Sequence, residues 1–158
     1  MPTLHASGGD FAYTDAGTGE AVILLHAAGG NRRQWRALIE RLAGRYRVFA
    51  PDLGGHGDTG PWPAGPSRLG DYAPVINALI GLAGAHRAHL VGHSHGGAIA
   101  GIHALDQPQT VTTLTLIEPM LTHLLGQSDE RAAWKEAHSQ ATLHQEAVAA
   151  GRLDETAE

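Results

Sequence analysis

Apolar residues along the chain gather in short runs that polar and glycine-rich stretches separate. The four main runs cover residues 21–26, 46–53, 88–94 and 111–119. The first, AVILLH, is continuous rather than alternating, which is typical of a strand buried on both faces of a sheet. A further strand is predicted at residues 11–17, where FAYTDAG ends in a turn at Gly17. The hydrophobic pattern therefore predicts five strands.

Segments with helical spacing stand between these runs. They cover residues 32–44, 71–85 and 95–107. In the first of them, apolar residues recur at steps of three and four, and Gly44 is a natural C-terminal stop. Because strands and helices alternate, we predict the α/β class, with a three-layer α/β/α sandwich around a mostly parallel sheet. The chemistry of such sheets lies beyond the carboxyl ends of the strands.

Residues 92–96, GHSHG, place a serine between a predicted strand and a predicted helix of small residues. A strand that turns at once into a helix strains the backbone at its apex. Gly92 and Gly96 remove the Cβ atoms that would clash in so tight a turn. We therefore expect Ser94 to present its hydroxyl as a nucleophile at this elbow. The alternative is that Ser94 only caps the helix.

A nucleophile that attacks an acyl carbon needs hydrogen-bond donors for the oxyanion that forms. The N–H group of His95, the residue after the nucleophile, is one candidate. We expect the second to be the N–H group of Ala28 in the loop 26–31, where Gly29 and Gly30 permit a turn. The alternative is that this loop is a plain connection between strand and helix.

Four segments carry a resemblance to a known family. They are AVILLHAAGGNRRQW, YRVFAPDLGGHGDT, HLVGHSHGGAIA and VTTLTLIEP. In their order and spacing they resemble the first two-thirds of the core of the α/β-hydrolase superfamily, especially its cap-bearing esterase, lipase and C–C hydrolase-like members. The resemblance implies a nucleophile at Ser94 and oxyanion donors at Ala28 and His95. The family usually has glycine where Ala27 stands, which crowds the loop without removing a donor.

The same resemblance suggests the domain organisation. We expect residues 1–120 to form the N-terminal part of the core, and residues 121–158, rich in alanine and charge, to begin a helical cap. The family order is nucleophile, acid, histidine. Because no strand is predicted after Pro119, we expect the chain to be truncated after the sixth core strand, without its base-bearing part.

Glu118, at the end of the 111–119 run, is the best candidate for the acid of a catalytic triad, or else it only lines the pocket. None of the eleven histidines stands out as the base. We expect His26, His93 and His123 to contribute to substrate binding, and His26 to pack under the oxyanion loop. His93 and His95 are two residues apart, but no nearby carboxylate completes a metal-ligand set, so no metal site is predicted.

The sequence thus predicts a serine hydrolase that acts on a carboxylic ester or related small acyl substrate through an acyl-enzyme, without a cofactor. The alternative is a non-catalytic α/β-hydrolase-like binding module or an inactive fragment. The strand at 111–119 is expected to be an exposed sheet edge. Such an edge favours a homo-oligomer or pairing with a complementing C-terminal segment.

The composition of the chain bears on its partners and its cellular location. The net charge of −5 argues against a nucleic-acid partner. The chain has no cysteine, which is compatible with a cytoplasmic location. Its beginning does not resemble a signal peptide, and no apolar run has the length of a membrane span. We therefore expect a cytoplasmic protein with no membrane partner.

Other side chains are expected to serve the scaffold. Trp35 lies on the apolar stripe of its helix and is expected to pack that helix on the sheet. The basic residues within 32–47 are expected to form a solvated helix face, and His56 a hydrogen-bonded part of its loop. Trp62 and Trp134 are candidates for lining an apolar substrate pocket.

Overall fold

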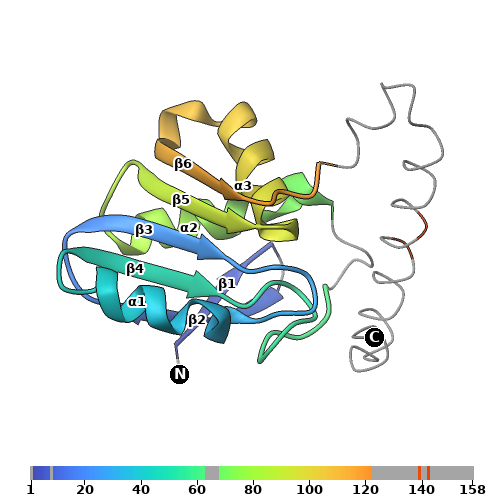
Figure 1. Ribbon diagram of the computed structural model, residues 1–158, viewed down its shortest axis with the longest axis horizontal. Coiled ribbons are helices and arrows are strands. Elements are labelled where there is room, and N and C mark those ends of the chain that lie inside the picture. Colours follow the sequence, from blue (N-terminus) through green and yellow to red (C-terminus); the bar gives the residue numbers. More distant parts are fainter. Residues whose placement is uncertain (1, 8, 63–67, 122–138, 140–141, 143–158) are drawn as a thin grey trace.

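The computed structural model describes residues 2–7, 9–62, 68–121, 139 and 142. Its centre is a six-stranded sheet with the order β1-β2-β4-β3-β5-β6 (Figure 1). The strands are β1 (Thr3–Ala6), β2 (Gly9–Ala16), β3 (Glu20–Leu25), β4 (Tyr46–Pro51), β5 (Ala88–His93) and β6 (Val111–Ile117). The last four run parallel to one another, whereas β1 and β2 pair antiparallel. The predicted mostly parallel sheet is confirmed.

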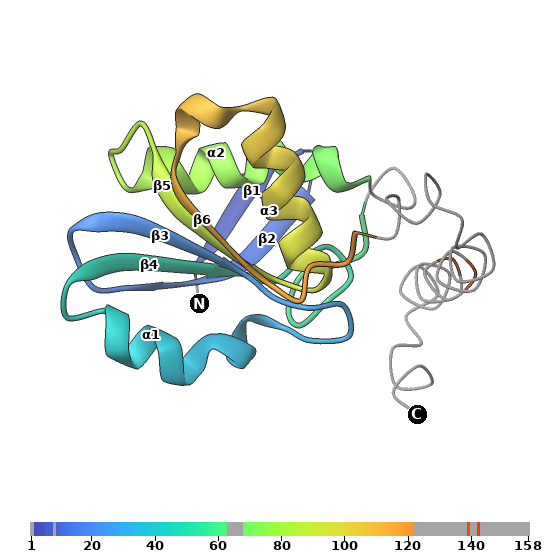
Figure 2. The same cartoon turned by 45° about the horizontal axis from the view of Figure 1, so that its top comes forward.

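Helices cover both faces of this sheet. They are η1 (Arg32–Trp35), α1 (Arg36–Leu42), η2 (Leu69–Tyr72), α2 (Ala73–Leu82), α3 (His95–Asp106) and η3 (Pro108–Thr110). Figure 2 shows α1 on one face and α2 with α3 on the other. The predicted three-layer α/β/α arrangement is therefore confirmed.

The core has two parts, one on each face of the sheet, and β3 contributes to both. Ile23 and Leu25 belong to the larger cluster, whereas Val22 and Leu24 belong to the smaller one with Trp35. These four β3 side chains are at most 4% exposed. A strand buried on both faces explains why its sequence is a continuous apolar run. Trp35 packs its helix on the sheet, as predicted.

Some element boundaries differ from the sequence prediction. The segment 32–44 begins as a 3₁₀ turn whose first residue follows Asn31, and the Asn31 side chain accepts a hydrogen bond from the Arg33 N–H group. The segment 71–85 also opens with a 3₁₀ turn, and α2 ends before Gly84, which has a φ of 68°. Strand β1 was not predicted, because four half-exposed residues give no clear pattern.

Strand β6 occupies the edge of the described sheet, as the sequence predicted for this segment. It pairs with β5 in parallel, and its side chains are mostly exposed. Leu114, Leu116 and Ile117 are 38–40% exposed, which is high for large apolar residues.

Candidate active site

Ser94 stands at the junction of β5 and α3, at the carboxyl edge of the sheet. Its backbone has a φ of 50° and a ψ of −111°, a strained conformation for a residue other than glycine. The residue is partly exposed, and its side chain makes no capping hydrogen bond to α3. The strained turn thus presents the hydroxyl rather than using it as a helix cap.

The backbone of Ser94 is held on both sides by the end of β6. Its N–H group donates to the carbonyl of Ile117 at 2.9 Å. Its carbonyl accepts from the N–H groups of Ala98 and Met120, each at 3.0 Å. These bonds offset the strain of the elbow, because a sparsely populated backbone conformation persists only where its surroundings dictate it.

The glycines around Ser94 permit close approach between backbone segments. A Cβ atom on Gly92 would lie 2.3 Å from the carbonyl oxygen of Gly96. A Cβ atom on Gly96 would lie 2.3 Å from the carbonyl oxygen of Leu25, at the end of β3. Both positions therefore require glycine. The motif is a packing requirement of the turn from strand to helix.

The loop 26–31 lies against the first turn of α3. The Gly96 N–H group donates to the carbonyl of His26 at 3.2 Å, which ties the loop to the elbow. Within the loop, Gly30 donates to the carbonyl of Ala27 at 3.1 Å, and Gly29 has a φ of 73°. Within the described part of the chain, the N–H group of Ala28 has no hydrogen-bond partner. A ligand oxygen is one partner that such a group could take.

His26 lies inside the protein rather than on the wall of the site. Its ring is fully buried, Nε2 accepts from the Leu53 N–H group at 2.9 Å, and Nδ1 donates to the carbonyl of Ala27 at 2.7 Å. Burial lowers the pKa of His26 to about 4, so the ring is neutral. A fully buried ring does not contact a substrate, so the structure differs here from the expected binding role. His26 instead joins the loop after β3 to the segment after β4.

A buried ion pair links the same two segments. Asp52 is fully buried; it accepts a bond from the Arg32 N–H group at 2.7 Å and pairs with the Arg32 guanidinium. The guanidinium also donates to Asp58 at 2.6 Å, and this bond lowers the pKa of Asp58. Arg32 is only 6% exposed, so the expected solvated helix face is wrong for this residue.

Two of the predicted site residues lie beside each other above the elbow. His93 directly precedes Ser94, and its Nε2 atom is 3.9 Å from a carboxylate oxygen of Glu118. Glu118 follows β6 with a φ of 43°, and its side chain is 89% exposed. His123, the third histidine expected to contact substrate, lies outside the described residues.

The hydroxyl of Ser94 has no side-chain partner among the described residues. Across residues 2–7, 9–62 and 68–121, no side chain makes a hydrogen bond to the Ser94 hydroxyl. His56, whose Nδ1 is 2.9 Å from the Gly54 carbonyl, is part of its own loop, as expected. Glu118 is the candidate acid that the structure places nearest to His93.

The described residues show neither a metal cluster nor a membrane-spanning helix. Among them, no three His, Asp or Glu side chains gather in a way that could hold a metal ion. In the described part of the chain, no helix has the length and apolar character needed to cross a membrane.

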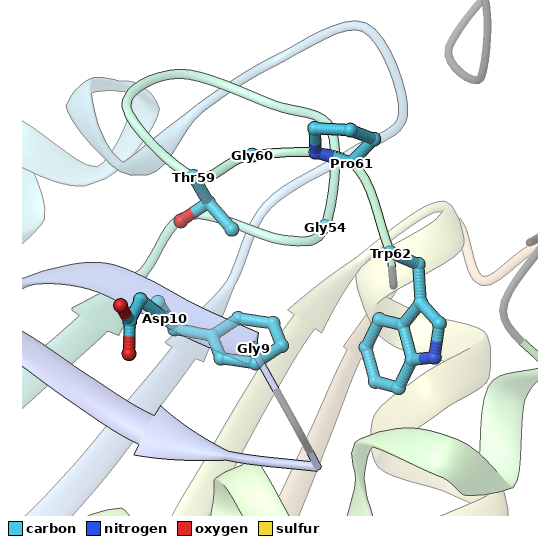
Figure 3. Close-up of a pocket in the computed structure, with 8 residues that line it drawn as sticks. Gly9, Asp10, Gly54, Thr59, Gly60, Pro61 and Trp62 are labelled. Atoms are coloured by element: carbon cyan, nitrogen blue, oxygen red, sulfur yellow. The ribbon is translucent and has the colours of Figure 1, made fainter. Parts of the chain in front are cut away.

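A small cavity of about 130 Å³ opens between the start of β2 and the loop after β4 (Figure 3). It is lined by Gly9, Asp10, Phe11, Gly54, Thr59, Gly60, Pro61 and Trp62. Trp62 stands edge-on to Phe11, with ring centroids 5.6 Å apart. Trp62 thus lines a cavity, but neither Ser94 nor the loop 26–31 takes part in it. Trp134 lies outside the described residues.

Sequence reasoning found the elbow and the loop but missed three side chains that organise them. Arg32 and Asp52 form the buried ion pair, and Gln34 contacts both Ala27 and His93. The only available signal was the carboxylate of Asp52 at the end of a buried strand, since a buried charge requires a partner.

The chain resembles known proteins over most of its length. It is 38% identical over 104 residues to the dihydrolipoyllysine-residue acetyltransferase component of an acetoin cleaving system from Cupriavidus necator, a match that covers 66% of this chain and 28% of that protein. It is 32% identical over 122 residues to lipase 3 of a Moraxella species, with 75% of this chain and 38% of the lipase covered.

Solved structures show the same likeness. A thermophilic esterase from Thermogutta terrifontis superposes with a TM-score of 0.70 at 28% identity, over 75% of this chain and 46% of the esterase. The chain therefore spans less than half the length of each of these three proteins. The family model described as alpha/beta hydrolase fold matches residues 20–154. This match covers most of the chain, and the protein belongs to the alpha/beta hydrolase fold family.

Proposed function

We propose that this chain carries the nucleophile half of a serine hydrolase that acts on a carboxylic ester or a related small acyl substrate. The observation that carries the proposal is the strained elbow at Ser94, a partly exposed residue whose hydroxyl has no hydrogen bond within the described residues. Relatives of the chain include hydrolases such as a lipase and an esterase, which supports hydrolytic chemistry in general.

In the proposed reaction, the Ser94 oxygen attacks the acyl carbon and its proton passes to a general base. The developing oxyanion accepts hydrogen bonds from the N–H groups of Ala28 and His95. The base then gives its proton to the leaving alcohol, and an acyl-enzyme remains. Water attacks this ester, which releases the carboxylic acid and returns a proton to Ser94.

Within the described residues no side chain is hydrogen-bonded to the Ser94 hydroxyl, so the scheme leaves the base unassigned. Glu118 is the acid in the scheme. Its carboxylate is 89% exposed, so it orients a base effectively only when further residues cover it and exclude water. The histidines at 93 and 123 remain proposed contacts for the substrate.

The decisive experiment is covalent labelling of the purified chain with a fluorophosphonate probe, followed by mass mapping of the adduct. We expect slow labelling at Ser94 that added imidazole accelerates, because imidazole acts as a base from solution. Turnover of p-nitrophenyl acetate is expected to be weak, since no described side chain is hydrogen-bonded to the Ser94 hydroxyl.

A matched control is available within the chain. Ser7 is exposed and also has a φ of 50°, but it lies after β1 rather than between a strand and a helix, and its hydroxyl donates to the Asp71 carbonyl at 3.2 Å. Ser94→Ala should abolish labelling, whereas Ser7→Ala should leave it unchanged. If the fluorophosphonate probe forms no adduct at Ser94 of the folded chain even with imidazole present, the hydrolase proposal fails. A non-catalytic binding module then becomes the better account.

A further inference from the structure

The side chain of Gln34 spans the gap between the loop 26–31 and the elbow. Its Oε1 atom accepts a hydrogen bond from the Ala27 N–H group at 3.2 Å. Its Nε2 atom lies 3.1 Å from Nδ1 of His93, a residue 59 positions away along the chain. The Gln34 backbone is itself held, since its N–H group donates to the Asn31 carbonyl at 3.0 Å. One amide group therefore contacts both parts of the proposed site.

The hydrogen-bond partners determine how this amide and the imidazole are oriented. A backbone N–H group can only donate, so the Gln34 atom that faces Ala27 must be the oxygen. The Nε2 amide group then faces His93 and donates, so Nδ1 of His93 must accept. The proton of the neutral imidazole consequently lies on Nε2, the atom that is 3.9 Å from the Glu118 carboxylate.

We propose that Gln34 is a positioning residue that holds the two oxyanion donors in register. Ala27 directly precedes Ala28, and His93 lies two residues before His95, so the bridge joins the chain segments that carry the two donors. It also fixes His93 as the Nε2–H tautomer. The role in oxyanion binding rests on the proposed function, but the bridge and the tautomer do not.

The surroundings of the amide are shaped to receive it. A Cβ atom on Gly30 would lie 3.2 Å from Oε1 of Gln34, so glycine at this position leaves room for the Gln34 side chain.

The hydrogen bond from Gln34 to His93 also bears on the general base. Because Nδ1 of His93 is occupied by Gln34 and Nε2 carries the proton, His93 is not the base for Ser94. The histidine that precedes the nucleophile is held as part of the scaffold.

The first experiment reads the tautomer directly. Imidazole ¹⁵N spectra of the full chain, recorded above the titration range of histidine, distinguish the protonated nitrogen of a ring from the bare one, and His93→Asn assigns the signals. We expect the Nε2–H form in the parent chain. Gln34→Glu replaces the donor by an acceptor and should switch the ring to the Nδ1–H form.

The second experiment measures the rate of fluorophosphonate labelling at Ser94 in the presence of imidazole. Gln34→Ala should slow labelling about 10-fold, less than the 10²–10³ expected when an oxyanion donor is removed outright. Gln34→Glu keeps the acceptor for Ala27 and should restore part of the rate. The control is Gln109→Ala, at an exposed position, which should change neither the rate nor the tautomer.

The outcomes separate this inference from the hydrolase proposal. A ring that keeps the same tautomer in the parent chain, Gln34→Ala and Gln34→Glu would overturn the bridge, whatever Ser94 does. A switched tautomer with unchanged labelling rates would overturn the positioning role. If Ser94 never reacts, the hydrolase proposal fails, while the tautomer still decides whether the bridge exists. Circular dichroism verifies that each variant is folded.

Discussion

Strands β5 and β6 are neighbours in the sheet and run in the same direction, but they differ sharply in burial. Leu90 of β5 is fully buried, whereas Leu114, its register partner in β6, is 39% exposed. β5 has a strand on each side, while the described residues place no strand beyond β6. Apolar content alone therefore does not determine burial; the neighbours of a strand do.

The exposed strand still contributes to the proposed site. The carbonyl of Ile117 and the N–H group of Met120 hold the backbone of Ser94 from the end of β6. The strained elbow at the end of the buried strand thus depends on hydrogen bonds from the exposed one. The buried strand β5 thus supplies the stable core, while the exposed strand β6 helps to fix the backbone geometry of Ser94.

Paired truncations test the contrast in burial most strongly. Leu90→Ala should lower the free energy of unfolding by about 4 kcal/mol, because it leaves a cavity in a closed core. Leu114 is the register partner of Leu90 in β6. Leu114→Ala should lower the free energy of unfolding by only about 1 kcal/mol, since the leucine side chain is already partly exposed to water. Urea unfolding of both variants measures the difference. Equal costs would show that β6 is covered in solution.

A second pair of variants tests the elbow between β5 and α3. Gly96→Ala places a methyl group 2.3 Å from the Leu25 carbonyl oxygen and should cost about 3 kcal/mol, with loss of labelling at Ser94. Gly101→Ala lies in the same helix with nothing within 4 Å of the added atom. It should stabilise the chain by about 0.5–1 kcal/mol. Urea unfolding again provides the measurement, and a tolerated Gly96→Ala would contradict the close approach.

The difference between local and distant signals explains what the sequence could predict. β3 was predictable because a run of apolar residues is a local pattern, and the elbow because Gly92 and Gly96 flank Ser94 directly. β1 was missed because Thr3–Ala6 is short and its pairing with β2 is a tertiary contact. Local patterns thus predicted most of the fold and the position of the strained elbow at Ser94.

The remaining parts of the site depend on contacts between distant residues. Arg32 and Asp52 are 20 positions apart, and Gln34 and His93 are 59 apart. Neither contact leaves a periodic pattern, because each requires two loops to meet at the edge of a finished sheet. His26 lies beneath the loop, as the sequence predicted, but its bond to Leu53 is another contact between distant segments.

The buried centre should also respond to acid more strongly than the exposed edge. Burial lowers the pKa of His26 from 6.5 to about 4, so the unfolded chain takes up a proton first as the pH falls below 6.5. Stability is therefore fully present above 6.5 and is lost progressively toward 4, with a loss of about 2 kcal/mol between about pH 7 and pH 5.

Comparison of His26→Gln with the parent chain separates the contribution of His26 to the pH dependence of stability from the contribution of the carboxylates. His26→Gln should reduce the loss of stability between pH 7 and pH 5 by about 2 kcal/mol, in addition to any uniform destabilisation. His86→Gln, at an exposed position, should keep the slope of the parent chain. Urea unfolding at several pH values provides the slopes. A His26→Gln slope that matches the parent would show that the ring is not buried in solution.

Substitutions in β6 are expected to change the stability least. They also test most directly whether this edge strand pairs with another chain. We expect the 158-residue chain to self-associate through this strand, because no described strand pairs with its outer edge and apolar side chains flank that edge. Replacing Leu114 and Leu116 by threonine introduces β-branched residues that favour a strand, so the free energy of unfolding should change by less than about 1 kcal/mol. Association, measured by sedimentation velocity, should weaken about 10-fold or more, since apolar area no longer drives it. A parent chain that sediments as a monomer at every concentration would contradict this account, and would mean that exposed leucines on an edge strand are insufficient for pairing.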